Sequence, residues 1–138
     1  MKQLKRVSGF ALMFLSFSVF AEIAVIVHPS NTDTLSQEEI QRVFLAKTKT
    51  FPSGEQAVPI DFDDSVAVKN DFIGQVLNRN SSQIKAYWAK LVFTGKAQPP
   101  KTVASDDEML KLIAANPNMI GYIDASKVSP DVRVVGTF

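Results

Sequence analysis

The sequence has 138 residues, with 15 lysine and arginine side chains, 14 aspartate and glutamate side chains, and no cysteine. The lack of cysteine excludes disulfides, thiolate metal sites and cysteine nucleophiles. Because the basic residues form no run, the sequence also lacks the charge pattern of a nucleic-acid-binding protein and that of a polybasic lipid-binding stretch.

The first 21 residues have the order of a secretory signal peptide. Three basic residues within the first six precede an apolar stretch over residues 10–20, and Val19 and Ala21 then stand at the −3 and −1 positions before Glu22. An uncleaved membrane anchor is the alternative, but the stretch is short for a span of about 20 residues. We therefore predict cleavage between Ala21 and Glu22, export to the periplasm, and no membrane insertion after cleavage.

Residues 22–138 form the second predicted segment, a single domain. Loss of residues 1–21 leaves 117 residues with 12 basic and 14 acidic side chains, so the formal net charge changes from +1 to −2. A chain of this length can build one hydrophobic core of its own.

The first half of this domain predicts two strands with one helix between them. Residues 23–27 form a continuous apolar, β-branched run, typical of a strand buried on both faces. Ser36 and Glu39 have the spacing of a capping box, and they predict a helix that buries Ile40, Val43 and Phe44. Residues 57–61 predict a second strand, in which Pro59 favours an edge or end position.

The second half predicts three more helices and three short extended segments. Asp64 or Ser65 is expected to cap a helix with Val68, Phe72, Ile73, Val76 and Leu77 on its buried face. Ser81 or Ser82 is expected to start a helix whose buried stripe is Ile84, Tyr87, Trp88, Leu91 and Val92. Residues 102–104 are extended, residues 105–108 repeat the capping-box pattern before another helix, and residues 120–123 and 132–135 are closing strands.

The resulting element order is β-α-β-α-α-β-α-β-β, without internal repeats or linkers. This alternation indicates an α/β domain, with a sheet that carries helices packed on its faces.

Few residues suggest catalysis. His28 is the only histidine and is followed directly by Pro29 in a loop, so we interpret it as a loop-packing residue and not as a catalytic base or a metal ligand. Nucleotide-binding glycine motifs are missing. We therefore predict a non-enzymatic protein with no cofactor.

An acidic turn over residues 61–65 is the densest polar feature. Its free N–H groups at a helix start could hold an anion. Alternatively, its three carboxylates could hold a hard cation such as calcium, although the EF-hand spacing is missing. A third interpretation is structural, in which Asp64 or Ser65 caps the helix and the acids stabilise its positive end.

Three segments gain meaning from their order along the chain. Residues 35–47 form a predicted helix ending in Phe-Leu-Ala-Lys, residues 58–65 join a strand to an acidic turn, and residues 115–123 end in Ile-Gly-Tyr-Ile. Together they resemble the phosphate-binding proteins of bacterial ABC importers, which have a helix followed by Phe-Leu-Gly-Lys and a closing Pro-Gly-x-Ile-Gly-Tyr. The resemblance covers the chain from about Ile23 to Val135.

The resemblance implies a fold and a location for a ligand site. Members of the family are bilobed type 2 periplasmic binding proteins, and the likeness covers only the second lobe and the crossing strands. It therefore implies a single three-layer lobe, a mixed sheet with helices on both faces.

The family's turn Arg-x-Asp-x-Ser-Gly-Thr corresponds here to residues 61–67. The candidate anion site then consists of Asp63, Asp64, Ser65, Val66 and Ala67. Asp63 and Ser65 match the family's pattern, but Asp61 stands at the arginine position, so the site is expected to be degenerate.

Two functions follow as expectations. The first is a periplasmic solute-binding protein for phosphate or another small anion. The second is a periplasmic or surface adapter that reuses the lobe without transport. Expected partners are an ABC permease, a second protein lobe or another copy of the chain, and residues 23–27 and 132–135 are expected to expose apolar area for such a contact.

Overall fold

The computed structural model describes residues 21–138, together with Gly9 and Leu15. The predicted signal peptide and its cleavage site therefore lie outside the described residues, apart from those two residues and Ala21. Among the residues that the structure describes, no helix has the length and the hydrophobicity needed to cross a membrane.

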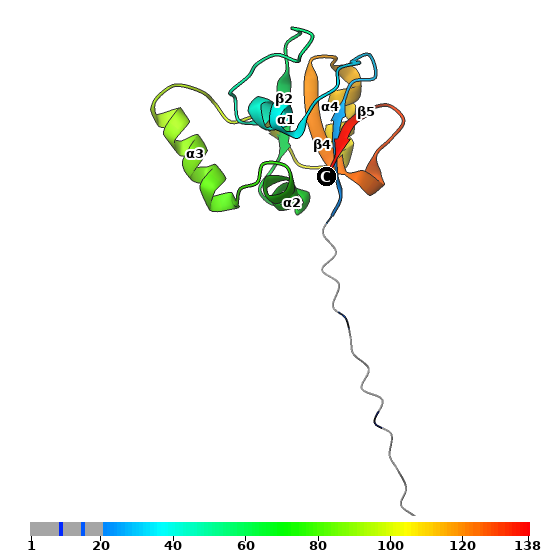
Figure 1. The fold of residues 1–138 in the computed structure, drawn as a ribbon, viewed down its shortest axis with the longest axis horizontal. Coiled ribbons are helices and arrows are strands. Elements are labelled where there is room, and N and C mark those ends of the chain that lie inside the picture. The colour runs from blue at the N-terminus through cyan, green and yellow to red at the C-terminus, as the bar shows by residue number, and fades with distance from the viewer. Residues whose placement is uncertain (1–8, 10–14, 16–20) are drawn as a thin grey trace, which may run out of the picture.

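Five strands form one mixed sheet in the order β3-β2-β4-β1-β5 (Figure 1). Strand β2 runs parallel to β3 and β4, whereas β1 runs antiparallel to β4 and β5. The strands are β1 (Ile23–Val27), β2 (Val58–Phe62), β3 (Lys101–Val103), β4 (Met119–Asp124) and β5 (Arg133–Thr137). The predicted α/β class and mixed sheet are confirmed.

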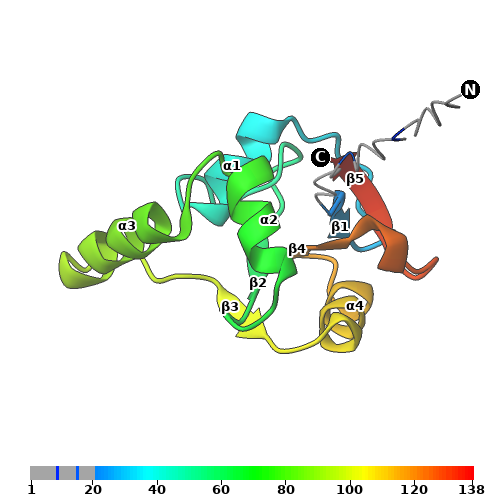
Figure 2. The same ribbon diagram turned by 90° about the horizontal axis from the view of Figure 1, so that it is seen from below.

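Helices cover both faces of this sheet (Figure 2). In β4, the ring of Tyr122 stacks on Phe72 with centroids 3.7 Å apart, while a Cβ added to the preceding Gly121 would meet Met109 at 2.5 Å. Because successive residues of a strand point to opposite faces, the helices that carry Phe72 and Met109 lie on opposite sides. The helices are α1 (Gln37–Phe44), α2 (Val68–Gln75), α3 (Ser81–Phe93) and α4 (Asp106–Ala115), followed by a short 3-10 turn at Ala125–Lys127.

Strand β1 lies inside the sheet and is buried throughout. Ile23 to Val27 are at most 1% exposed, because β4 and β5 flank the strand and helices α2 and α4 pack on its two faces. The prediction that this strand exposes apolar area is therefore wrong. Near β5, Val132 is buried as well, and only Val134 reaches 38% exposure.

The helix starts confirm the capping predictions in part. At α1, the Ser36 side chain accepts from the Glu39 N–H and the Glu39 carboxylate accepts from the Ser36 N–H, a complete capping box. At α4, Ser105 accepts from the Glu108 N–H, but the Glu108 carboxylate accepts from Ala104 instead. Helix α3 begins at Ser81, one of the two predicted start residues, and its N-cap is Asn80.

Pro59 lies near the start of β2, although β2 is not an edge strand. Its neighbour Ile60 is the first residue that pairs with β3, so the missing N–H of proline interrupts no bond to that strand. The predicted end position is correct, and the edge position is wrong.

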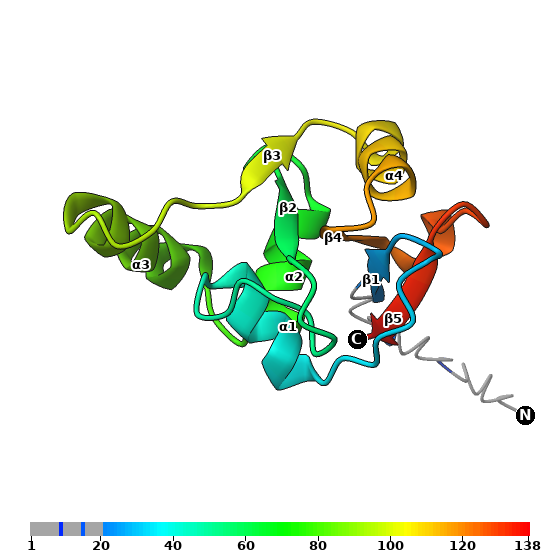
Figure 3. The same ribbon diagram turned by 90° about the horizontal axis from the view of Figure 1, so that it is seen from above.

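Helix α3 projects from the rest of the molecule (Figure 3). Of its predicted buried stripe, only Ile84 is buried; Tyr87, Trp88 and Leu91 are half-buried, and Val92 is 43% exposed. The spacing correctly indicated a helix, but this helix packs on the body mainly through its first turns.

Candidate functional site

The candidate anion-site residues lie together in the turn between β2 and α2. Asp63 follows the last residue of β2, and its N–H donates to the Val103 carbonyl of β3 at 2.9 Å. The Val66 N–H then donates to the Asp63 carbonyl at 3.0 Å and closes the turn. The turn thus sits at the carboxyl ends of two parallel strands, where ligands bind in open α/β sheets.

Helix α2 begins later than its sequence predicts. Its N-cap is Ala67, which supplies no side-chain hydrogen bond, and the Lys69 N–H donates to the Val66 carbonyl at 3.1 Å. Neither Asp64 nor Ser65 caps the helix, so that prediction is wrong. An additional turn over residues 63–67 separates the polar residues from the first helical residue.

Asp61 is held by three groups at the end of β2. The Tyr122 hydroxyl donates to its Oδ1 atom, and the Phe62 N–H donates to the same oxygen at 2.8 Å. The Lys69 Nζ atom lies 3.8 Å from Oδ2. Burial raises the pKa of Asp61, and the hydrogen bond from Tyr122 and the charge of Lys69 offset that rise only in part.

Tyr122, which is completely buried, is the second titratable group here. Burial, followed by the charge of Asp61, raises the pKa of its phenol. The hydroxyl therefore remains protonated and serves as a fixed hydrogen-bond donor to the carboxylate.

Lys69 is the residue of this site that sequence reasoning missed. Its side chain is 14% exposed, and its Nζ atom lies 2.9 Å from Oδ1 of Asp64, which lowers the pKa of that carboxyl. The separation of five residues from Asp64 is not a helical pairing distance, so no sequence pattern indicates the contact. The turn brings the two side chains together.

The charge of the assembled site remains negative. Asp61, Asp63 and Asp64 contribute three carboxyls. Against them stand the ammonium of Lys69, which two of them already engage, and the charge of Lys85, which acts on Asp64 from α3. A phosphate dianion at this turn would meet net repulsion at short range. The turn also does not suit a calcium ion, because Asp61 is already engaged by Tyr122 and Lys69. Among residues 21–138, no three His, Asp or Glu side chains converge into a metal-binding group.

His28 has a local structural role. Its Nδ1 atom accepts from the Ser30 N–H at 3.0 Å and lies 2.7 Å from the Ser30 hydroxyl. This arrangement orders the loop after β1, in agreement with the loop-packing interpretation.

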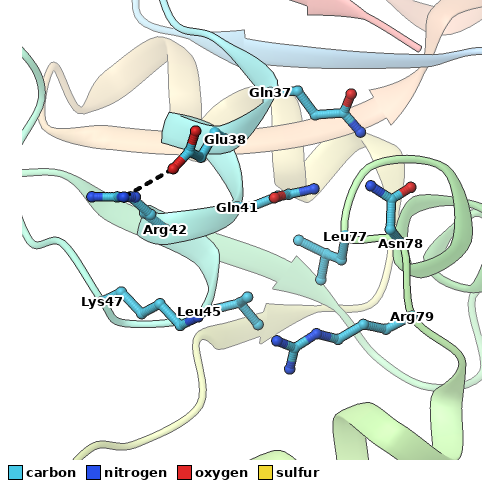
Figure 4. Close-up of a pocket in the computed structure, with 9 residues that line it drawn as sticks. All are labelled: Gln37, Glu38, Gln41, Arg42, Leu45, Lys47, Leu77, Asn78 and Arg79. Carbon is cyan, nitrogen blue, oxygen red and sulfur yellow. Dashed lines mark hydrogen bonds and ion pairs between the residues drawn. The ribbon is translucent and has the colours of Figure 1, made fainter.

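A hollow in the surface lies away from this turn, between α1 and the connection from α2 to α3 (Figure 4). Its volume is about 820 Å³, and Arg42, Lys47 and Arg79 are among its lining residues. Gln37 and Gln41 cross from α1 and donate to carbonyls at the end of α2, at 2.8–3.1 Å. We call these hydrogen bonds from Gln37 and Gln41 the joint between α1 and α2. The hollow lies on the outer side of this joint.

Each cation around this hollow has a structural explanation. Ala46 and Asn78 adopt left-handed conformations after α1 and α2, with φ values of 58° and 53°, and each is followed by a cation. Cations are favoured near the negative ends of helices. Arg79 also lies 4.9 Å from the centroid of the Tyr87 ring, and Arg42 pairs with Glu38 at 2.9 Å.

The fold is that of one lobe of the phosphate-binding receptors of ABC transporters. No protein-family model matches the sequence, and no curated protein matches it either. The likeness therefore comes from solved structures, at identities that establish the fold alone.

Three of these structures illustrate the likeness. An ABC-type phosphate transport receptor from Vibrio cholerae matches with a TM-score of 0.60 and 14% identity over 84% of this chain and 46% of its own. A structure from Clostridium perfringens is described as a phosphate ABC transporter substrate-binding protein with bound phosphate. It matches with a TM-score of 0.64 and 18% identity over 84% of this chain and 45% of its own. PstS from Borrelia burgdorferi matches with a TM-score of 0.60 and 18% identity over 86% of this chain and 48% of its own. The chain thus spans about half the length of these proteins.

Proposed function

We propose that this protein is an exported, non-enzymatic binding-protein lobe of the periplasm whose phosphate site is degenerate, and that it acts by contact with another protein. The observation that carries the proposal is the network at the β2–α2 turn. There Lys69 is engaged by Asp61 and Asp64, and Tyr122 occupies a further acceptor position of Asp61.

The network leaves an anion without a free cation among the residues of the turn and of α2. The charge of Lys85 in α3 already acts on Asp64. The start of α2 favours negative charge by only about half an elementary charge. Against it stand three carboxyls, of which Asp64 is 76% exposed and faces any incoming ligand. One lobe alone also leaves a ligand largely in water, which weakens each polar contact.

Calorimetric titration of the purified protein with inorganic phosphate tests the proposal. We expect no binding tighter than about 1 mM. Asp64→Asn removes one exposed charge and frees Lys69, so it should improve phosphate affinity by about threefold or more. Asp131→Asn is the matched control, since it removes an exposed acid of the loop before β5 and should change nothing.

A small-anion receptor is the second candidate function. It is favoured by the ammonium of Lys69 at the turn and by the fold likeness to a protein solved with bound phosphate. Submillimolar phosphate binding that disappears in both Ser65→Ala and Lys69→Met would establish this receptor and reject the first proposal. An ABC permease would then be the partner to test.

A further inference from the structure

The charge of the domain is divided unevenly between α3 and the rest. Residues 72–105 contain five basic side chains and no aspartate or glutamate; the five are Arg79, Lys85, Lys90, Lys96 and Lys101. The remainder of residues 22–138 holds seven basic and all 14 acidic side chains, a net charge of −7. We call residues 79–101 the basic arm. Its lysines are five or six residues apart, so they form no run in the sequence.

The arm presents an apolar surface on the side that faces away from the body. Ala86, Ala89 and Phe93 share one face of α3 at i, i+3 and i+7, and all three are exposed. Phe93 is 93% exposed. We call these three residues the outer stripe; by helical geometry Lys85 and Lys90 lie on its two sides.

An outer stripe of this composition suits a protein contact. The two alanines allow another surface to come close to the helix backbone, and a fully exposed aromatic ring is the type of side chain that anchors interfaces. The same stripe partitions poorly into a bilayer, because two alanines contribute little apolar area beside one phenylalanine.

We propose that the outer stripe docks on the acidic body of a second copy of this chain. The arm carries +5 and the body −7, so arm-to-body contact is attractive, whereas contact between two arms would bring like charges together. The body exposes carboxylates at Asp64, Asp107 and Glu108. A reciprocal exchange, in which each arm contacts the other body, closes as a two-fold pair. The inference needs only these surfaces and holds whether or not the β2–α2 turn binds phosphate.

Sedimentation velocity of the purified protein tests this inference. Between about 10 µM and about 500 µM protein we expect reversible dimerisation at about 20 mM salt. At about 500 mM salt the dissociation constant should rise at least about tenfold, because the attraction between exposed charges is screened.

Two variants and one control assign the association to the arm. Phe93→Ser and Lys96→Glu should each weaken the dimer by about tenfold or more, and neither should affect folding, because both side chains are exposed. Lys111→Glu makes the same charge change on the exposed side of α4 and should leave the dimer less affected than Lys96→Glu does.

Three results would overturn the proposal. They are a monomer at every concentration in low salt, a dimer that withstands Phe93→Ser, and a dimer that is insensitive to salt. Co-sedimentation with vesicles of phosphatidylglycerol and phosphatidylethanolamine is the parallel measurement. A monomer that binds these vesicles through Phe93 would assign the outer stripe to an anionic membrane instead.

Discussion

Asp61 is the residue at which burial and hydrogen bonding act in opposite directions. Its carboxyl is largely buried, yet it receives hydrogen bonds from Tyr122 and Phe62 and the charge of Lys69. Burial dominates and raises its pKa above the ordinary value of 3.8. Folding therefore favours the protonated form of this carboxyl.

The raised pKa has a definite consequence for stability. The contribution of Asp61 is fully present below its unfolded pKa and is lost as the pH rises through its folded pKa. Asp61→Asn cannot ionise and keeps a side-chain acceptor for Tyr122. Its free energy of unfolding, relative to that of the unmodified protein, should therefore increase from about pH 3.5 to about pH 7, which means that the variant becomes relatively more stable. Urea unfolding across that range measures the difference.

Asp64 provides the control of opposite sign. Lys69 lowers its pKa, so its contribution is present above the unfolded pKa and is lost as the pH falls through the folded pKa. Asp64→Asn should accordingly lower the free energy of unfolding at neutral pH and leave it unchanged in acid. The loss should be at most about 1 kcal/mol, because the Asp64 side chain is exposed. Parallel pH profiles for the two variants would contradict the assigned network.

Gly121 and Gly74 differ in the space that surrounds them, so replacement by alanine should have opposite effects on stability. A Cβ on Gly121 would meet Met109 at 2.5 Å and Ile113 at 3.1 Å, both of which are fully buried, so Gly121→Ala should destabilise by about 1–3 kcal/mol. Gly74 lies inside α2 with nothing within 4 Å of such a Cβ, and Gly74→Ala should stabilise by about 0.5–1 kcal/mol. Denaturant midpoints test both. A neutral Gly121→Ala would mean that α4 can move away from the sheet at little cost.

At the scale of elements, α1 and α2 are joined by side chains that complete a helix end. The Gln41 amide donates to the Val76 carbonyl at 2.8 Å, and the Gln37 amide donates to the carbonyls of Gln75 and Val76. These carbonyls belong to the last turn of α2, where helical partners are missing. The joint fixes α2 and, with it, the position of Lys69.

Loss of one of these amides should therefore weaken the joint. Gln41→Ala should lower the free energy of unfolding by about 0.5–1.5 kcal/mol, since alanine is itself a good helix former and only the hydrogen bond is lost. Gln98→Ala, in the exposed loop before β3, should have no effect. Equal denaturant midpoints for the two variants would show that water replaces the Gln41 amide without cost.

At the scale of the whole molecule, burial is concentrated in the central strands, and among the four α-helices it is lowest in α3. Strand β1 is buried at every residue, whereas Ile84 is the only buried residue of α3. Local opening requires little apolar exposure where few side chains are buried. Hydrogen exchange should therefore find the highest protection in β1 and β4 and the lowest helical protection in the last turns of α3. An α3 as protected as β1 would show that the arm is covered by a partner or by a second copy.

Much of the architecture followed from local sequence signals. The apolar run of β1, the capping box of Ser36 and Glu39, and the helical spacing after Ser81 each depend on neighbouring residues alone, and the structure confirms all three elements. The resemblance in segment order correctly indicated a single lobe, because the order of elements largely determines which topologies are compact.

Features that depend on contacts between distant segments were decided only by the tertiary structure. The acidic turn was visible in the sequence, but its pairing with Lys69 and Tyr122 depends on how β2, α2 and β4 meet. The burial of β1 depends on which strands flank it, and the exposure of Phe93 depends on where α3 leaves the body. Helical periodicity records which residues share a face, but not whether another element covers that face.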